Sequence, residues 1–334
     1  MSNRIDKRVW AALCVVYVVW GSTYLAIRVA DRTIPPFPMA AVRFLVAGSL
    51  LFAWAARRDD GRGSDPLGRP QWRAATVVGG LLLFGGNGAV VWAETRVDSG
   101  VTALIIATVP IWMAVMTAVR DRRGVAARVI LGLVIGFGGT GLLVRATESS
   151  SGSSGAVGIA VVLGGAVCWA LGSVLSQRLP LPRRPLVATA MEMVAGGALL
   201  AVASLVSGEA WRVHPSAVSL QSFLGLLYLI TVGSWAGFSA YVWLLKNATT
   251  SLTSTYAYVN PVIAVLLGWA ILGERIAGMT VLAAALIVGA VTLIVLGQRA
   301  RAPAMRTPAR RVDGVMPIQA SPADAPAVQD EAAT

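Results

Sequence analysis

Aromatic and polar side chains recur at helical spacing inside two apolar segments of the chain. Each set has three side chains spaced four residues apart: Trp20, Tyr24 and Arg28 and, 149 positions later, Trp169, Ser173 and Gln177. Residues four apart share one face of a helix, so each set forms a stripe. We expect Trp20, Tyr24, Trp169 and Ser173 to line a solute path, because hydrogen-bonding groups suit a solute better than lipid. Core packing is the alternative for the two tryptophans.

Three further residues are polar where the corresponding residue of the other half of the chain, 151 positions away, is apolar. They are Asn87, Tyr256 and Asn260, and the last two lie four residues apart. A polar group that is present in only one half is not needed for the structure that the two halves have in common. We therefore predict that all three bind solute. An interhelical hydrogen bond, commonly worth about 0.6 kcal/mol in membrane proteins, is the alternative.

Charged residues and prolines inside apolar segments form a second group of candidates. Charges within membrane helices are functional candidates by default, so Arg43, Glu94 and Glu192 are candidates for charge or proton coupling. Anchoring near the outer surface is the alternative for Glu94. Pro110 and Pro261 each remove a helical hydrogen bond and are expected to kink their helices, as a hinge or as a static bend.

Several kinds of chemistry are excluded by residues that the sequence lacks. A phosphate-binding P-loop needs Gly-Lys followed by Ser or Thr, and neither Lys7 nor Lys246 follows a glycine. The only histidine is His214, and both cysteines, Cys14 and Cys168, lie in apolar segments. No cluster of Asp, Glu or His marks an enzyme site. We expect no catalytic residue, no metal and no cofactor.

Composition identifies the broad class of protein. Hydrophobic residues make up 56% of the 334 residues and charged residues 13%, which leaves too little polar surface for a soluble globule. The net charge of +12 comes from arginines in short clusters between apolar segments rather than along one face. This pattern argues against nucleic-acid binding and for a lipid bilayer as the surroundings.

The apolar segments predict ten transmembrane helices, since a bilayer core needs about 20 mostly apolar residues per helix. The segments are 9–30, 36–56, 73–93, 99–119, 128–145, 156–178, 185–207, 218–244, 250–272 and 278–297. A Gly/Ser-rich joint at residues 148–155 divides them into two five-helix domains, 9–145 and 156–297. The polar, proline-containing tail at 298–334 is expected to be disordered and cytoplasmic.

The two domains are expected to be inverted repeats. Six residues between Phe84 and Pro110, including Trp92 and Pro110 themselves, recur at a constant shift of 151. Because each repeat has five helices, the second must enter the membrane from the opposite side. With a cytoplasmic N-terminus, 21 of the 28 lysines and arginines fall on the cytoplasmic side. This bias predicts that both termini are cytoplasmic.

These motifs together resemble those of the EamA-type transporters of the drug/metabolite transporter superfamily. They are Trp20-Gly21-Ser22-Thr23-Tyr24, Arg43-Phe44, Asn260-Pro261 and Leu272-Gly273-Glu274. The resemblance covers residues 9–297 and implies a ten-helix carrier of the bacterial inner membrane that works by alternating access. Such carriers usually export amino acids, related metabolites or toxic compounds, and helices one, three, four, six, eight and nine line their cavity.

The sequence departs from the family pattern in two places. The Gly-Glu ending of the ninth segment has no counterpart after the fourth, and residues 9–30 contain no carboxylate. The resemblance therefore gives no support for proton coupling through the first helix, as in small multidrug transporters. The sequence predicts a non-ATP carrier for a small solute and leaves the oligomeric state open. A channel, or a membrane scaffold without carrier activity, is the alternative function.

Overall fold

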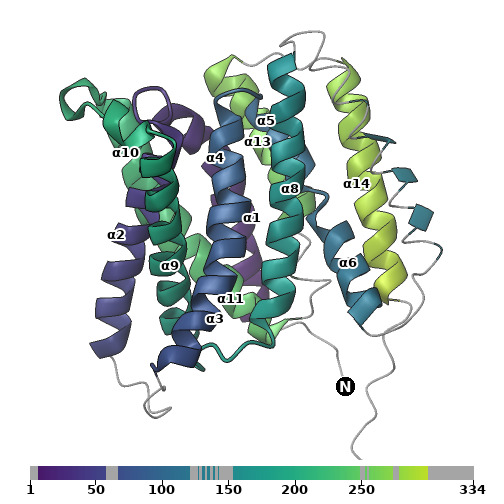
Figure 1. Ribbon diagram of the computed structural model, residues 1–334. Coiled ribbons are helices and arrows are strands. Elements are labelled where there is room, and N and C mark those ends of the chain that lie inside the picture. Colours follow the sequence, from purple (N-terminus) through teal and green to yellow (C-terminus); the bar gives the residue numbers. More distant parts are fainter. Residues whose placement is uncertain are drawn as a thin grey trace, which may run out of the picture. The chain divides into compact units, whose positions relative to one another are not determined.

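The computed structural model consists of helices joined by turns and loops in the part of the chain that it describes (Figure 1). The described residues are 7–57, 67–120, 127, 130–131, 134–135, 138–139, 142, 153–248, 253, 256–273 and 278–299. The predicted fifth helix lies largely outside these residues, and so does the predicted tail from residue 300 onward.

The elements have the following bounds. The helices are α1 (Lys7–Ala30), α2 (Pro36–Arg57), α3 (Arg69–Gly79), η1 (Gly80–Asn87), α4 (Gly88–Glu94), α5 (Ser99–Ile106), α6 (Val109–Arg120), α8 (Ser153–Ser176), α9 (Pro185–Val206), η2 (Glu209–Arg212), η3 (Pro215–Ala217), α10 (Leu220–Tyr228), η4 (Leu229–Phe238), α11 (Ser239–Asn247), α13 (Tyr256–Leu272) and α14 (Gly278–Arg299). Two of the short elements, η2 and η3, are 3₁₀ turns, whereas η1 and η4 are π-helical.

Seven helical stretches of the described chain are long and apolar enough to cross a membrane. They are Lys7–Ala30, Pro36–Ala55, Arg69–Glu94, Val101–Val119, Gly155–Ser176, Pro185–Val206 and Leu220–Asn247. Each coincides with one of the predicted segments, which confirms an all-helical membrane protein. Two of these spans are composite, because α3, η1 and α4 follow one another without a break, as do α10, η4 and α11.

The π-helical segments lie in the middle of the two composite spans and were not predicted. They end at Asn87 and Phe238, which are 151 residues apart. A π-helical segment inside an α-helix is frequently found at a functional site. A methyl group at Gly86 would lie 2.8 Å from the Trp169 ring, and one at Gly237 would collide with the Trp20 indole. Glycine at these positions therefore lets the two indole rings pack directly on the π-helical turns.

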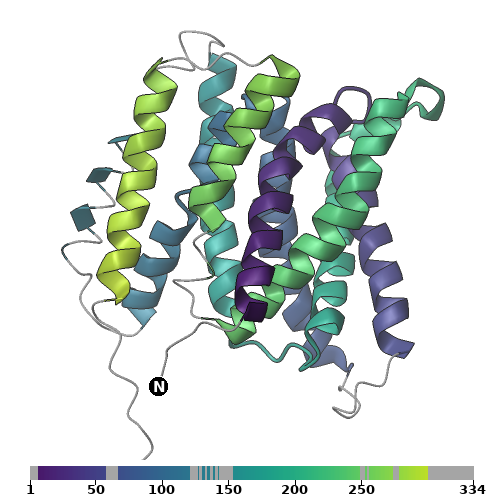
Figure 2. The same ribbon diagram turned by 180° about the vertical axis from the view of Figure 1, so that it is seen from behind.

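Helix packing surrounds α1 with later elements of the chain. It contacts α13 and the whole α10–η4–α11 span, which lie beside it in Figure 2. The other large interface joins α2 to α9, and α8 packs on η1 and α6. Many of the buried residues of α1, including Trp20 and Tyr24, belong to one hydrophobic core shared with α13, η4 and α11.

The two predicted proline kinks lie in different backbone settings. The fourth span is interrupted, since α5 ends at Ile106 and α6 begins at Val109, which places Pro110 in the first turn of α6. In contrast, α13 continues from Tyr256 to Leu272 through Pro261.

Candidate functional site

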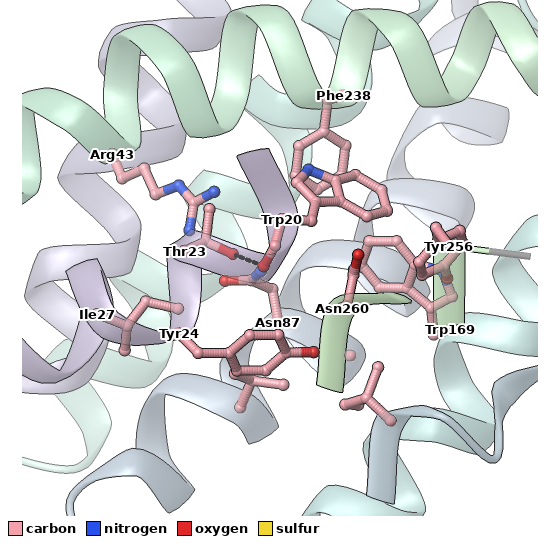
Figure 3. A pocket seen from close by; sticks show the side chains of 13 residues that line it. Trp20, Thr23, Tyr24, Ile27, Arg43, Asn87, Trp169, Phe238, Tyr256 and Asn260 are labelled. Atoms are coloured by element: carbon pink, nitrogen blue, oxygen red, sulfur yellow. Dashed lines mark hydrogen bonds between the residues drawn. The ribbon is translucent and has the colours of Figure 1, made fainter. Parts of the chain in front are cut away.

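A cavity of about 50 Å³, here called the aromatic cavity, lies among α1, α2, α4, α5, α8, α13 and the π-helical segments (Figure 3). Its walls include six of the seven predicted solute-binding residues: Trp20, Tyr24, Asn87, Trp169, Tyr256 and Asn260. Arg43 and Phe238 also line it. The structure thus brings together side chains that are up to 240 positions apart in the sequence.

Five rings form a cluster at one end of this cavity, here called the aromatic cluster: Trp20, Trp169, Phe238, Tyr241 and Tyr256. The ring of Trp20 is the hub, with centroids 4.8 to 5.4 Å from those of Tyr241, Phe238, Tyr256 and Trp169. Several pairs are edge-to-face, an arrangement that adds about 0.5–1.5 kcal/mol to the burial of an aromatic pair. The cluster is therefore a rigid, apolar wall.

Ser173 does not line the aromatic cavity but helps to position one of its rings. Its hydroxyl donates to Trp169 O at 2.8 Å, so the Tyr241 hydroxyl, 2.8 Å away, donates to Ser173 Oγ. The Trp169 Nε1 group in turn donates to the Tyr241 hydroxyl at 3.2 Å. Neither Tyr241 nor Phe238 was predicted to be part of the site, although Tyr241 is polar where its counterpart Val90, 151 positions earlier, is apolar.

Four side-chain polar atoms of residues that line the aromatic cavity have no hydrogen-bond partner in the described part of the chain: Trp20 Nε1, Arg43 Nη1, Asn87 Oδ1 and the Tyr256 hydroxyl. Arg43 is 1% exposed and its Nε donates to Ser234 Oγ at 2.9 Å, but no described carboxylate forms an ion pair with it. Leaving a donor or acceptor buried and unpaired costs about 1–3 kcal/mol or more. A solute that accepts from Arg43 and donates to Asn87 would recover this cost.

Asn260 is held between two helices. Its side-chain amide lies 3.2 Å from Tyr17 O and 3.1 Å from Tyr256 O, and it can bond both only by donating from Nδ2. The predicted alternative, an interhelical hydrogen bond, is thus present. The amide oxygen is not used by these two bonds and is the group that remains to accept from a solute.

A second cavity, of about 370 Å³, contains Glu192 in its wall and is here called the Glu192 cavity. Glu192 is 3% exposed, whereas Gln177, Arg183 and Lys246 line the same cavity and are exposed. Gln177 is the end of the second predicted stripe, so this stripe runs from the aromatic cavity at Trp169 to the Glu192 cavity.

Arg28 and Glu94 meet where α1 and α4 end, and neither residue lines either cavity. Arg28 donates to the backbone oxygens of Glu94 and Val97 and forms an ion pair with Asp98 at 3.5 Å. Glu94 is fully buried, so it does not reach an outer surface as the anchoring alternative required. Burial, together with nearby Glu94, raises the pKa of the Asp31 carboxyl well above its usual range.

No group of three His, Cys, Asp or Glu side chains in the described part of the chain is placed to hold a metal ion. The chemistry available at the aromatic cavity is therefore recognition by rings, a guanidinium group and two amides.

Comparison with known proteins places the fold and the site in context. The EamA-like transporter family matches residues 8–145 and 156–296. The uncharacterized inner membrane transporter YedA of Escherichia coli is 40% identical over 292 residues, 86% of this chain and 91% of its own. An uncharacterized transporter of Synechocystis is 25% identical over 84% of this chain and 88% of its own. A solved crystal structure has the same fold, with a TM-score of 0.62 at 21% identity, covering 88% of this chain and 99% of that one.

Proposed function

The chain belongs to the EamA-like transporter family, and we propose that it is a secondary carrier that exports a small metabolite, amino acid or drug without ATP. It is a multi-pass inner-membrane transporter rather than an enzyme. The observation that carries the proposal is the aromatic cavity, in which Arg43 Nη1 and Asn87 Oδ1 are buried beside five rings with no partner in the described chain.

The proposed architecture has ten helices in two inverted five-helix repeats, with both termini cytoplasmic. The two family matches, 8–145 and 156–296, support two repeats of similar length. The two π-helical segments, 151 residues apart at their ends, support the same correspondence. The distribution of lysines and arginines supports the orientation.

The proposed mechanism assigns different parts of a solute to different walls of the aromatic cavity. The rings of Trp20 and Trp169 pack against the apolar part, while Arg43, Asn87 and Asn260 orient the polar groups. A volume of about 50 Å³ has room for little more than one or two water molecules. A solute therefore enters only when the helices separate, which is the rocking movement expected of inverted repeats.

Counterflow in proteoliposomes tests this proposal directly. Vesicles are loaded in turn with unlabelled amino acids, nucleosides and cationic drugs, and accumulation of the labelled compound is compared between wild type and Asn260→Ala. We expect one compound class to give counterflow that the variant loses, at equal membrane abundance.

The matched control is Asn247→Ala, which removes an exposed amide on α11 and should leave counterflow unchanged. Loss of abundance together with transport in Asn260→Ala would assign Asn260 a structural role. Flux without saturation or counterflow would favour a channel, and no flux from folded protein would favour a membrane scaffold.

A further inference from the structure

The two cavities follow one another along the same helices. On η1, Leu82 lines the Glu192 cavity and Asn87 the aromatic cavity. On α8, Trp169 lines the aromatic cavity, and Ser176, seven residues or about 10 Å farther along the helix, lines the Glu192 cavity. The span formed by η4 and α11 also lines both cavities: Phe238, at the end of η4, lines the aromatic cavity, and Val242, on α11, lines the Glu192 cavity. The aromatic cluster therefore separates two successive compartments of one path.

The Glu192 carboxylate is buried in the wall of the Glu192 cavity and needs a group that compensates its charge. The residue is 97% buried, and no other described residue forms a hydrogen bond or ion pair with its carboxylate. A buried carboxylate is costly unless a proton, a cation or hydrogen-bond donors compensate it. Among the described residues that line this cavity, the charges of opposite sign are those of Arg183 and Lys246, which are exposed.

Lys246 attracts the Glu192 carboxylate electrostatically, but no hydrogen bond or ion pair joins the two side chains in the described chain. Its Nζ donates to Pro182 O at 3.0 Å and to Arg183 O at 3.3 Å, which holds the ammonium group at the loop between α8 and α9. The space between Glu192 and the two cations is part of the cavity of about 370 Å³, within the range of small-molecule sites. Leu179, Leu181 and Leu245 give the same space an apolar wall.

We propose that the Glu192 cavity is a second solute-binding site, in which the Glu192 carboxylate binds the protonated amino group of the transported solute. This inference rests on the proposed carrier function and adds a chemical class for the solute. The amine brings both a positive charge and several N–H donors, and charge-assisted hydrogen bonds of this kind are roughly twice as strong as neutral ones.

The position of Glu192 in the chain supports this assignment. It lies 149 residues after Arg43, the spacing that also separates Trp20 from Trp169. The two helices that carry them, α2 and α9, form the largest helix interface of the described chain. Corresponding positions thus present a guanidinium group to the aromatic cavity and a carboxylate to the Glu192 cavity. A solute with both charges has a partner for one of them in each compartment.

The test uses the full-length chain in lipid nanodiscs and three probes. These are L-leucine, 3-methylbutylamine, which is leucine without its carboxylate, and 4-methylpentanoate, which is leucine without its amino group. The rate at which N,N′-dicyclohexylcarbodiimide modifies Glu192 is measured by peptide mass spectrometry. We expect saturating L-leucine and 3-methylbutylamine each to slow the modification about tenfold, and 4-methylpentanoate to leave it unchanged. Glu209, on η2, is the internal control and should react at one rate throughout.

Several outcomes would overturn the assignment. Equal slowing by all three probes would mean that the cavity binds the apolar chain and not the amine. No slowing by either amine, with a rate that changes only with pH, would mean that the carboxylate binds a proton alone. A second measurement follows the thermal shift caused by L-leucine, which should need about tenfold more ligand in Glu192→Gln than in Glu192→Asp.

This experiment and the counterflow test can fail separately. Protection of Glu192 by amines, without counterflow in wild type, would support the amine-binding site and contradict the proposed carrier function. Counterflow without protection of Glu192 would support the carrier function and contradict the amine-binding site.

Discussion

The aromatic cavity and the Glu192 cavity use the same helices for different tasks. The first has a volume of about 50 Å³ and is closed by rings, and its charge is a buried guanidinium group. The second has about 370 Å³, reaches exposed basic residues, and its buried charge is a carboxylate. The charges stand 149 residues apart, at the spacing of the two tryptophans. Corresponding positions of a repeated scaffold can therefore line two different cavities, and the residue at each position determines whether its cavity has a positive or a negative charge.

The largest effect is expected from removing the charge of the aromatic cavity. Arg43→Met keeps an unbranched side chain, shorter by the guanidinium group that it removes, and we expect counterflow to fall about 100-fold, the cost of losing a buried charge-assisted contact. Thermal stability should stay equal or rise, because an apolar residue is cheaper to bury than an unpaired cation. Arg32→Met, at an exposed position, is the control. A fall in stability with unchanged transport would show that Arg43 serves the fold only.

An intermediate effect is expected from pushing a ring out of the cluster. In Gly237→Ala the new methyl group collides with the Trp20 indole, and overpacking of this kind costs about 1–3 kcal/mol. We expect counterflow to fall about tenfold. Gly164→Ala adds a methyl group with no heavy atom of the described chain within 4 Å and should have no effect. Equal activity of both variants would argue against a fixed position for Trp20.

A smaller effect is expected at the boundary between the two cavities. Tyr241→Phe removes the hydroxyl that joins Trp169 Nε1 to Ser173 Oγ, at a cost of about 0.5–1.5 kcal/mol per hydrogen bond. Counterflow should fall about threefold to tenfold, measured as initial rate. Tyr228→Phe removes a hydroxyl bonded to Ser22, away from both cavities, and provides the comparison. If the two variants behave alike, the bond to Trp169 has no special role.

The smallest effect lies outside both cavities, at Asp31. Burial raises the pKa of this carboxyl, so its contribution to stability is complete below its unfolded-state pKa and is lost as the pH rises through the folded-state value. Asp31→Asn should therefore raise Tm by about 1–3 °C at pH 7.5, and the gain should shrink as the pH falls toward 4. A pH-independent difference in Tm between variant and wild type would contradict this reasoning.

The sequence predicted those parts of the fold that depend on composition and spacing. Apolar length located the seven spans, and four-residue spacing placed Trp20 and Tyr24 on one face that lines the aromatic cavity. Arg28 continues the same spacing but does not line the cavity. Its guanidinium group donates to Val97 O and forms an ion pair with Asp98, both just after α4. The spacing of residues predicts which helix face a side chain lies on. The partner of that side chain, here Asp98 for Arg28, is 70 positions away and cannot be predicted from the spacing.

Other features of the site need three-dimensional contacts. Phe238, at the end of the π-helical segment η4, and Tyr241, on α11, join the aromatic cluster, and the sequence analysis did not predict the π-helical turn between α10 and α11. Glu192, on α9, was predicted from its charge alone, but its cavity also needs residues of η1, α8, α11 and the loop after α8. Glu94 is equally charged and lines neither of these cavities. A charge in a helix therefore identifies a candidate, and its neighbours decide its use.

Access to the two cavities from opposite sides of the membrane tests the carrier mechanism most directly. Single cysteines at Val90, in the aromatic cavity, and at Ser176, in the Glu192 cavity, are introduced into a chain with Cys14→Ser and Cys168→Ser. Each is labelled with an impermeant maleimide in vesicles of either orientation. We predict labelling of Ser176→Cys from the cytoplasmic side and of Val90→Cys from the outer side, with solute changing the two labelling rates in opposite directions. Labelling of both cysteines from one side, at rates that rise together, would contradict alternating access and indicate a continuous pore.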